Sequence, residues 1–130
     1  MKTQPDRLDG VNVISRQEPG RIWVNADVHE TSLLVPWRGQ PQPWPATTLA
    51  ELTAAHFDAV LALQPELVIF GSGPRLRFIA PTLYRSLIER GIGIETMDTP
   101  AACRTYNVLA TEGRSVVAAL LLESASSNAT

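Results

Sequence analysis

The sequence predicts an α/β fold, a three-layer α/β/α sandwich around a mixed β-sheet. One observation is the apolar run Leu67–Phe70, which is typical of a strand buried on both faces. Another is the alternation of helical and strand-like patterns beyond residue 53, which produces parallel strands with right-handed crossovers. With three strand-like segments before it, the predicted order is β-β-β-α-β-α-β-α-β.

The composition predicts one globular domain. The chain has 130 residues and 45% hydrophobic residues, enough for a single core. We expect the domain to span residues 11–123, with flexible polar ends at 1–10 and 124–130. The net charge of −2 argues against non-specific binding to nucleic acid or to anionic membranes.

Cysteine content and hydropathy predict the compartment. Cys103 is the only cysteine, so no intrachain disulfide forms, and a reducing compartment is expected. The first ten residues lack the apolar centre of a signal peptide. No run approaches the roughly 20 apolar residues of a membrane helix. These features predict a soluble, cytoplasmic protein.

The first 35 residues predict antiparallel strands. Alternation over Val11–Arg16 indicates one strand, and Arg21–Val24 a second, joined by a turn at Glu18-Pro19-Gly20. Thr31–Val35 is the third predicted strand, which Pro36 ends.

A proline-rich arm follows, from Pro36 to Pro45. Its four prolines predict the absence of regular structure, because proline removes a donor and fixes φ. Trp37 and Trp44 lie within it. Either they pack against the body, or they form a surface for a protein partner.

Three helices are predicted beyond the arm. The first begins after Thr53 or, as an alternative, at the capping box of Thr48 and Glu51; the cleaner apolar spacing favours Thr53. The second begins near Pro81 and ends at Gly91.

The third helix has Thr99 as its N-cap, Pro100 in its first turn, and an end before Gly113. Its core stripe is Ala102, Tyr106, Leu109 and Ala110. The strand Ile92–Met97 precedes it. Ser115–Leu122 follows as a strand or, as an alternative, a helix, and Val116-Val117 favours the strand.

The candidate site is a crevice at the carboxyl end of the Leu67–Phe70 strand. Gly71, Ser72 and Gly73 form a loop there, where open α/β sheets place ligands. Two glycines let backbone N–H groups approach an anion. The P-loop and dinucleotide-binding patterns are absent. A tight structural turn and a ligand-binding loop both remain open interpretations.

The start of the third helix supplies the other candidate residues. They are polar groups that would orient a ligand in the same crevice: Asp98, Thr99, Cys103, Arg104 and Asn107. The helix dipole favours a thiolate in the first turns, but a nucleophile also needs a nearby base. No histidine lies in these loops, so a small buried cysteine is the alternative. No catalytic residue is assigned.

Metal and cofactor chemistry has little support. His29 and His56 lack the spaced partners of a zinc site. We therefore expect no metal and no cofactor. Arg75, Arg77 and Arg104 either form an anion patch or a solvated rim, and the rim is favoured.

The combination of several segments resembles a known family. The segments are Pro65–Gly73, Gly91–Thr99, Ala101–Asn107 and Glu112–Arg114. They resemble small single-domain proteins of unknown function related to mitochondrial complex I assembly factor 3 and to the adipogenesis-associated domain protein. Ser72 stands where such loops often carry threonine.

The resemblance implies an α/β/α sandwich and supplies no catalytic residues to carry over. It also implies that the protein acts by binding protein partners. The first functional hypothesis is therefore a non-enzymatic protein-interaction module, similar to an assembly factor. The alternative is a small-ligand or anion-binding protein, or an enzyme, that uses the crevice between the Gly-Ser-Gly loop and the Cys103 helix.

Overall fold

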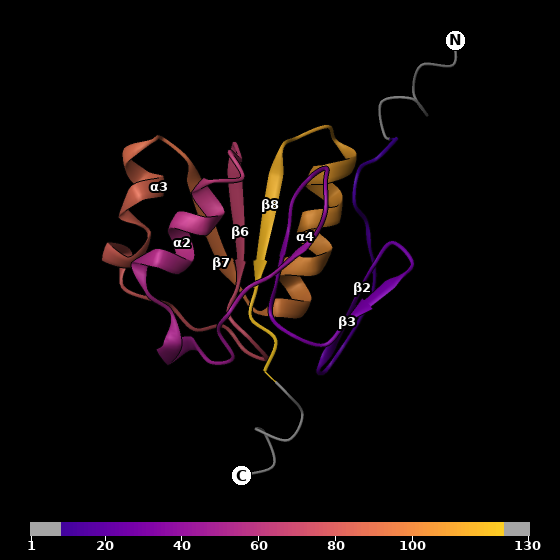
Figure 1. Ribbon diagram of the computed structural model, residues 1–130, viewed down its shortest axis with the longest axis horizontal. Helices are drawn as coiled ribbons and strands as arrows, with labels where there is room; N and C mark the ends of the chain where they lie inside the picture. Colours follow the sequence, from indigo (N-terminus) through magenta and orange to yellow (C-terminus); the bar gives the residue numbers. More distant parts are fainter. Residues whose placement is uncertain (1–8, 124–130) are drawn as a thin grey trace.

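The computed structural model describes residues 9–123 and contains a five-stranded mixed sheet (Figure 1). Its strands, in spatial order, are β5 (Gln42–Pro43), β4 (Leu33–Val35), β8 (Val116–Leu120), β6 (Leu67–Gly71) and β7 (Gly93–Met97). Strands β8, β6 and β7 are parallel, whereas β4 and β5 add antiparallel strands at one side. The predicted α/β class with a mixed sheet is confirmed.

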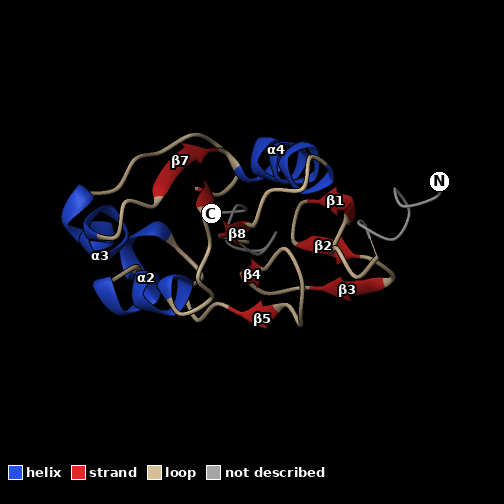
Figure 2. Ribbon diagram, turned by 90° about the horizontal axis from the view of Figure 1, so that it is seen from above, coloured by secondary structure: helices blue, strands red, loops and turns tan. Residues whose placement is uncertain are grey.

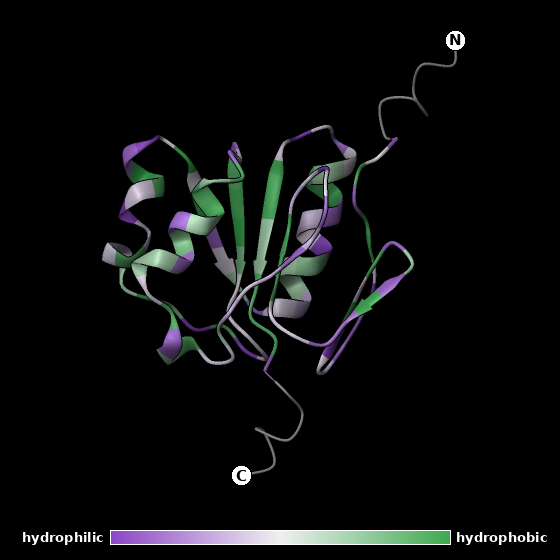
Figure 3. Ribbon diagram, in the orientation of Figure 1, coloured by the Kyte–Doolittle hydropathy of each residue, from purple (hydrophilic) through white to green (hydrophobic). Residues whose placement is uncertain are grey.

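Helices cover both faces of this sheet (Figure 2). One face carries α4 (Thr99–Thr111), and the other carries α2 (Ala54–Leu61), the 3-10 helix η2 (Pro81–Tyr84) and α3 (Arg85–Glu89). Successive residues of β6 enter opposite cores, Leu67 and Ile69 facing α4 while Val68 and Phe70 face α2. Both faces are therefore buried, as the apolar run predicted, and β6 and β8 are the most apolar strands in view (Figure 3).

A second, three-stranded sheet packs outside α4. It consists of β1 (Ile14–Glu18), β2 (Arg21–Val24) and β3 (Asp27–His29), all antiparallel. The predicted hairpin is present, but its first strand begins at Ile14 rather than Val11. The short β3 was not predicted. Asn25 adopts a φ of 56°, which asparagine tolerates, so the chain reverses within two residues.

The third predicted strand, Thr31–Val35, does not extend this hairpin. Its residues Leu33–Val35 form β4, which pairs antiparallel with β8 in the large sheet. Ser32 explains part of this placement, because its hydroxyl accepts a hydrogen bond from the Leu122 N–H at 2.8 Å.

The proline-rich arm contains regular structure, contrary to the prediction. Gln42 and Pro43 pair with β4 as the two-residue strand β5. The strand lies at the edge of the sheet, where the missing N–H of a proline leaves no neighbour unpaired. Both tryptophans of the arm pack against the body of the domain. Trp44 is 2% exposed and donates to the His56 carbonyl, and Trp37 donates to the Ala110 carbonyl.

The helix starts follow capping chemistry. Thr53 is the N-cap of α2, as favoured, and Thr48 precedes only the 3-10 turn η1 (Leu49–Glu51). Helix α4 departs from the prediction, because its N-cap is Asp98, not Thr99. The Asp98 carboxylate accepts from the Ala101 N–H at 2.8 Å. The Thr99 hydroxyl has another role, described below.

The ends expected to be flexible, 1–10 and 124–130, lie outside the described residues except for Asp9 and Gly10. Among residues 9–123, no helix is long and apolar enough to cross a membrane.

Candidate functional site

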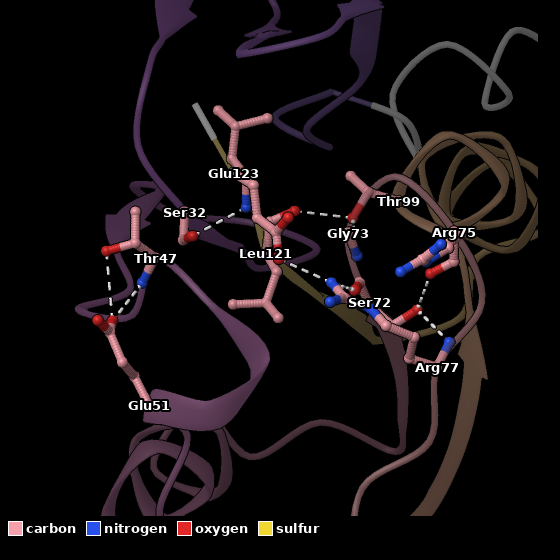
Figure 4. Close-up of polar contacts among 11 residues, drawn as sticks. Ser32, Thr47, Glu51, Ser72, Gly73, Arg75, Arg77, Thr99, Leu121 and Glu123 are labelled. Atoms are coloured by element: carbon pink, nitrogen blue, oxygen red, sulfur yellow. Dashed lines mark hydrogen bonds and ion pairs between the residues drawn. The ribbon is translucent and has the colours of Figure 1, made fainter. Parts of the chain in front are cut away.

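The Gly-Ser-Gly loop lies directly against the start of α4 (Figure 4). The Thr99 hydroxyl joins three segments: it accepts from the Gly73 N–H at 2.9 Å and donates to the Leu121 carbonyl at 2.8 Å. The Thr99 N–H donates to the Gly73 carbonyl at 2.8 Å. The loop that follows β6, the turn that follows β7 and the residues after β8 thus meet at one side chain, which is 3% exposed.

This geometry leaves the loop few donors for an anion. The Gly73 N–H is used by Thr99, and the Ser72 N–H donates to the Met97 carbonyl at 2.8 Å. The Ser72 hydroxyl donates to the Arg75 carbonyl and accepts from the Arg77 N–H. An anion cradle needs N–H groups that point into free space. Here the two N–H groups bond to Thr99 and Met97, and the Ser72 hydroxyl bonds within the loop, which fits the structural-turn interpretation.

Close packing explains why the loop has glycines. A Cβ at Gly71 would lie 2.9 Å from the Thr99 Oγ1 and 3.1 Å from the Leu120 Cδ2. Gly73 has a φ of 106°, which L-residues with a side chain rarely adopt. Both glycines therefore serve the contact between the loop and α4.

A cavity of about 170 Å³ lies next to the loop. It separates the β1–β2 turn from the loop and from the start of α4. Its lining comprises Gln17, Glu18, Pro19, Gly20, Gly73, Pro74, Thr99, Pro100, Leu121, Leu122 and Glu123. Of the predicted site residues, only Gly73 and Thr99 line it.

The remaining candidates on α4 lie elsewhere. Cys103 is 3% exposed, and burial raises the pKa of its thiol from 9.0 to about 12. A buried thiol with a raised pKa fits the alternative of a small buried cysteine better than a nucleophile. Asn107 anchors β1, because its side chain accepts from the Ile14 N–H at 2.9 Å and donates to the Ile14 carbonyl at 2.8 Å. Asp98 caps the helix.

The three arginines do not act alike. Arg77 is held in place: its Nη2 donates to the Ser72 carbonyl at 2.6 Å and to a Glu123 carboxylate oxygen at 2.7 Å. Arg75 and Arg104 are exposed and have no ion pair among the described residues. Arg104 does not line the cavity. The solvated-rim interpretation fits these two side chains.

Sequence reasoning missed two features of this end of the sheet. Glu123 was expected only to be the last residue of the domain, yet its carboxylate forms an ion pair with Arg77. The segment Leu76–Ala80, just before the helix expected at Pro81, was given no role, yet it exposes large apolar side chains, with Phe78 at 72%. The alternation of Leu76, Arg77 and Phe78 was the signal that could have found it.

No group of three or more His, Cys, Asp or Glu side chains between residues 9 and 123 is arranged to hold a metal ion. His56 has a structural role instead. Its Nδ1 accepts from the Thr53 N–H at 3.0 Å, and its Nε2 lies 2.8 Å from the Pro45 carbonyl oxygen.

Comparison with known proteins identifies the family. The family model described as "Protein of unknown function (DUF498/DUF598)" matches residues 14–121. The chain belongs to this DUF498/DUF598 family. An uncharacterized Rhodobacter capsulatus protein is 36% identical over 103 residues, covering 79% of this chain and 78% of that protein.

Solved structures show the same fold. A crystal structure of a Bordetella parapertussis protein superposes with a TM-score of 0.83 at 36% identity, covering 88% of this chain and 98% of that chain. A Bordetella pertussis protein described as an Mth938-like domain superposes with a TM-score of 0.76 at 28% identity, covering 92% of both chains.

A curated relative named for its role matches part of this chain. The bovine (Bos taurus) NADH dehydrogenase [ubiquinone] 1 alpha subcomplex assembly factor 3 is 38% identical over 80 residues, which is 60% of this chain and 44% of that protein. The predicted relation to this assembly factor is confirmed. The matched region spans less than half the length of the assembly factor.

Proposed function

We propose that this DUF498/DUF598 protein is a non-enzymatic protein-interaction module that helps to assemble a larger complex in the cytoplasm. The observation that carries the proposal is the 38% identity with an assembly factor over 80 residues. Two proteins that share a domain surface can share a role that depends on protein contacts. The rest of the longer relative has no counterpart in this match.

The chemistry of the crevice supports the proposal. Its polar groups hold the fold together: Thr99 joins three segments, and the Ser72 hydroxyl closes its own loop. Cys103 is buried, and burial raises the pKa of its thiol. Outside this region, large apolar side chains face solvent at Leu76 and Phe78, which are 51% and 72% exposed. Apolar side chains exposed next to each other, as here, support an interaction surface.

The test is recovery of a partner from the source cells. The full chain with a small affinity tag is expressed at its native level, chemically cross-linked and purified, with an unrelated tagged protein as the control. We expect the same partner, or subunits of one complex, in every replicate. If repeated purifications recover only the proteins found with the control, the assembly-module proposal is wrong.

A second candidate function follows from the cavity beside Gly73. Its volume of about 170 Å³ accommodates a small molecule, and Pro19, Pro74 and Pro100 give it apolar walls. We infer that a ligand there would be small and largely uncharged, since Arg77 already neutralises the Glu123 carboxylate. Titration with small apolar fragments should shift the amide signals of Gly73 and Glu123; unchanged signals would reject this candidate.

A further inference from the structure

The segment Leu76–Ala80 has the side-chain pattern of a strand but no strand partner. It connects the Gly-Ser-Gly loop to η2 and contains no helix, turn or bend. Leu76, Phe78 and Ala80 are exposed, while Arg77 and Ile79 between them are partly buried. Ile79 packs against the core beneath α2 and α3, and Arg77 is bonded to Ser72 and Glu123. Such alternation is typical of a half-buried β-strand.

One main-chain edge of this segment is hydrogen-bonded at Arg77, whereas the other edge is open at the N–H groups of Leu76 and Phe78. In an extended chain, the main-chain groups of alternate residues point to the same edge. The Ser72 hydroxyl binds the Arg75 carbonyl at 2.8 Å and the Arg77 N–H at 3.0 Å, so that edge is closed (Figure 4). Between residues 9 and 123, the N–H groups of Leu76 and Phe78 have no hydrogen-bond acceptor.

We propose that Leu76–Ala80 is an open strand edge to which an extended, acidic segment of a partner protein adds as a new strand. This inference rests on the proposed interaction function and gives it a surface. Strand addition would satisfy the unpaired main-chain groups, and alternate apolar residues of the partner would contact Leu76 and Phe78. Arg75 in this segment is exposed and has no ion pair among the described residues, and Pro74–Pro81 contains no carboxylate, so the open edge is complementary to an acidic partner.

Two other occupants fit the segment less well. A second copy of this chain would present the same exposed Arg75 and no carboxylate within Pro74–Pro81, so it lacks the opposite charge that an acidic partner supplies. A lipid surface would cover Phe78 but would leave the N–H groups of Leu76 and Phe78 without acceptors in a medium that offers none. A protein strand supplies both the acceptors and the opposite charge.

The first experiment maps the contact. The photo-reactive residue p-benzoylphenylalanine replaces Phe78 in one variant and Val108 in a control, since Val108 on α4 is also exposed, at 56%. The Phe78 variant should cross-link to one partner at a segment rich in Asp and Glu, and the Val108 variant should not. Cross-linking to a basic or helical segment, or equal cross-linking from Val108, would overturn the inference.

The second experiment uses a synthetic peptide of the cross-linked segment and the purified full chain. We expect the Leu76 and Phe78 amides to become protected from hydrogen exchange. Phe78→Asp should weaken binding by about 30-fold or more, as for an interface hot spot. Val108→Asp should not change the affinity. Thermal melts of both variants establish that they fold.

A backbone variant separates strand addition from side-chain contact. Ala80 has φ −64° and ψ 133°, which proline adopts, and its N–H has no partner among the described residues. Ala80→Pro therefore keeps Leu76 and Phe78 but removes one donor from the open edge. Binding should weaken roughly 2- to 10-fold, the range for one hydrogen bond. Unchanged affinity would overturn strand pairing.

The outcomes distinguish this inference from the proposed function. If the unmodified chain captures a partner that Phe78→Asp retains, the surface is wrong and the interaction function stands. If the unmodified chain captures no partner, the interaction function itself fails. A concentration-dependent dimer that Phe78→Asp dissociates, or flotation with phosphatidylcholine–phosphatidylserine vesicles that Phe78→Asp abolishes, would assign the segment to another occupant and overturn the inference.

Discussion

Two adjacent stretches of the chain, Gly71–Gly73 and Leu76–Ala80, differ in whether their polar groups are hydrogen-bonded within the chain. In the first, the Gly73 N–H, the Ser72 N–H and the Ser72 hydroxyl all bond within the chain. In the second, the Leu76 and Phe78 N–H groups have no acceptor among the described residues, and two large apolar side chains face solvent. The polar groups of the glycine-rich stretch are thus used within the fold, whereas two N–H groups of Leu76–Ala80 are not.

The largest expected effect is at Thr99, the centre of the closed stretch. Thr99→Val would leave the buried Gly73 N–H and Leu121 carbonyl unpaired. We expect a loss on the order of 3 kcal/mol in the free energy of unfolding, because each unpaired buried group costs about 1–3 kcal/mol. Thr99→Ser keeps the hydroxyl and should lose less than about 1 kcal/mol. Urea denaturation measures both; equal losses would contradict the hydrogen-bonding role.

The alkaline limit of stability tests the burial of Cys103. Its pKa is raised in the folded state, from 9.0 to about 12, so the folded protein holds this proton more tightly than the unfolded chain does. This contribution is fully present below pH 9 and is lost as the pH rises from about 9 to about 12, by up to about 1.4 kcal/mol per pH unit.

Cys103→Ala should therefore show a shallower loss of unfolding free energy above pH 9 than the unmodified chain. Tyr106 contributes a separate alkaline loss in both proteins, since burial also raises its pKa. Denaturation at intervals from pH 8 to pH 11, under reducing conditions, gives the two slopes. Identical slopes would show that the thiol ionises freely in the folded protein.

The elements of this fold were predictable where local chemistry decides the structure. The apolar run Leu67–Phe70, the N-cap Thr53 and the helix end at Gly113 each follow from adjacent residues. Thr99 was taken for an N-cap for the same local reason. Its hydroxyl instead bonds Gly73 and Leu121, which are distant in sequence, and Asp98 became the cap.

The position of the candidate site was predictable from the sequence, but which of its N–H groups are free was not. The sequence placed Gly71–Gly73 beside the start of α4, since both follow adjacent parallel strands. Whether an N–H group is free depends on tertiary partners such as Met97, which local patterns do not reveal. The open edge at Leu76–Ala80 was missed because its strand pattern is short and its proline flanks suggest a loop.

The Ser72 hydroxyl joins the two stretches and provides a smaller test. Ser72→Ala would remove the group that holds the Arg75 carbonyl and the Arg77 N–H. We expect a loss of about 1 kcal/mol in unfolding free energy and faster hydrogen exchange at Arg77. Ser86→Ala is the matched control, because the buried Ser86 hydroxyl has no partner among the described residues. A similar loss in both variants would assign the effect to packing alone.

The smallest expected effect is at Arg104 on α4, which we compare with Asp98 at the start of the same helix. Asp98→Ala removes an N-cap bond of 2.8 Å and should lower the unfolding free energy by about 1 kcal/mol. Arg104 is exposed and has no ion pair among residues 9–123. Arg104→Ala should therefore change the unfolding free energy by less than about 0.5 kcal/mol. Thermal and urea melts measure both. Affinity for the partner peptide should also stay unchanged in Arg104→Ala, because the open edge lies after β6 and not on α4. Lost affinity with unchanged stability would instead place the partner on the α4 surface.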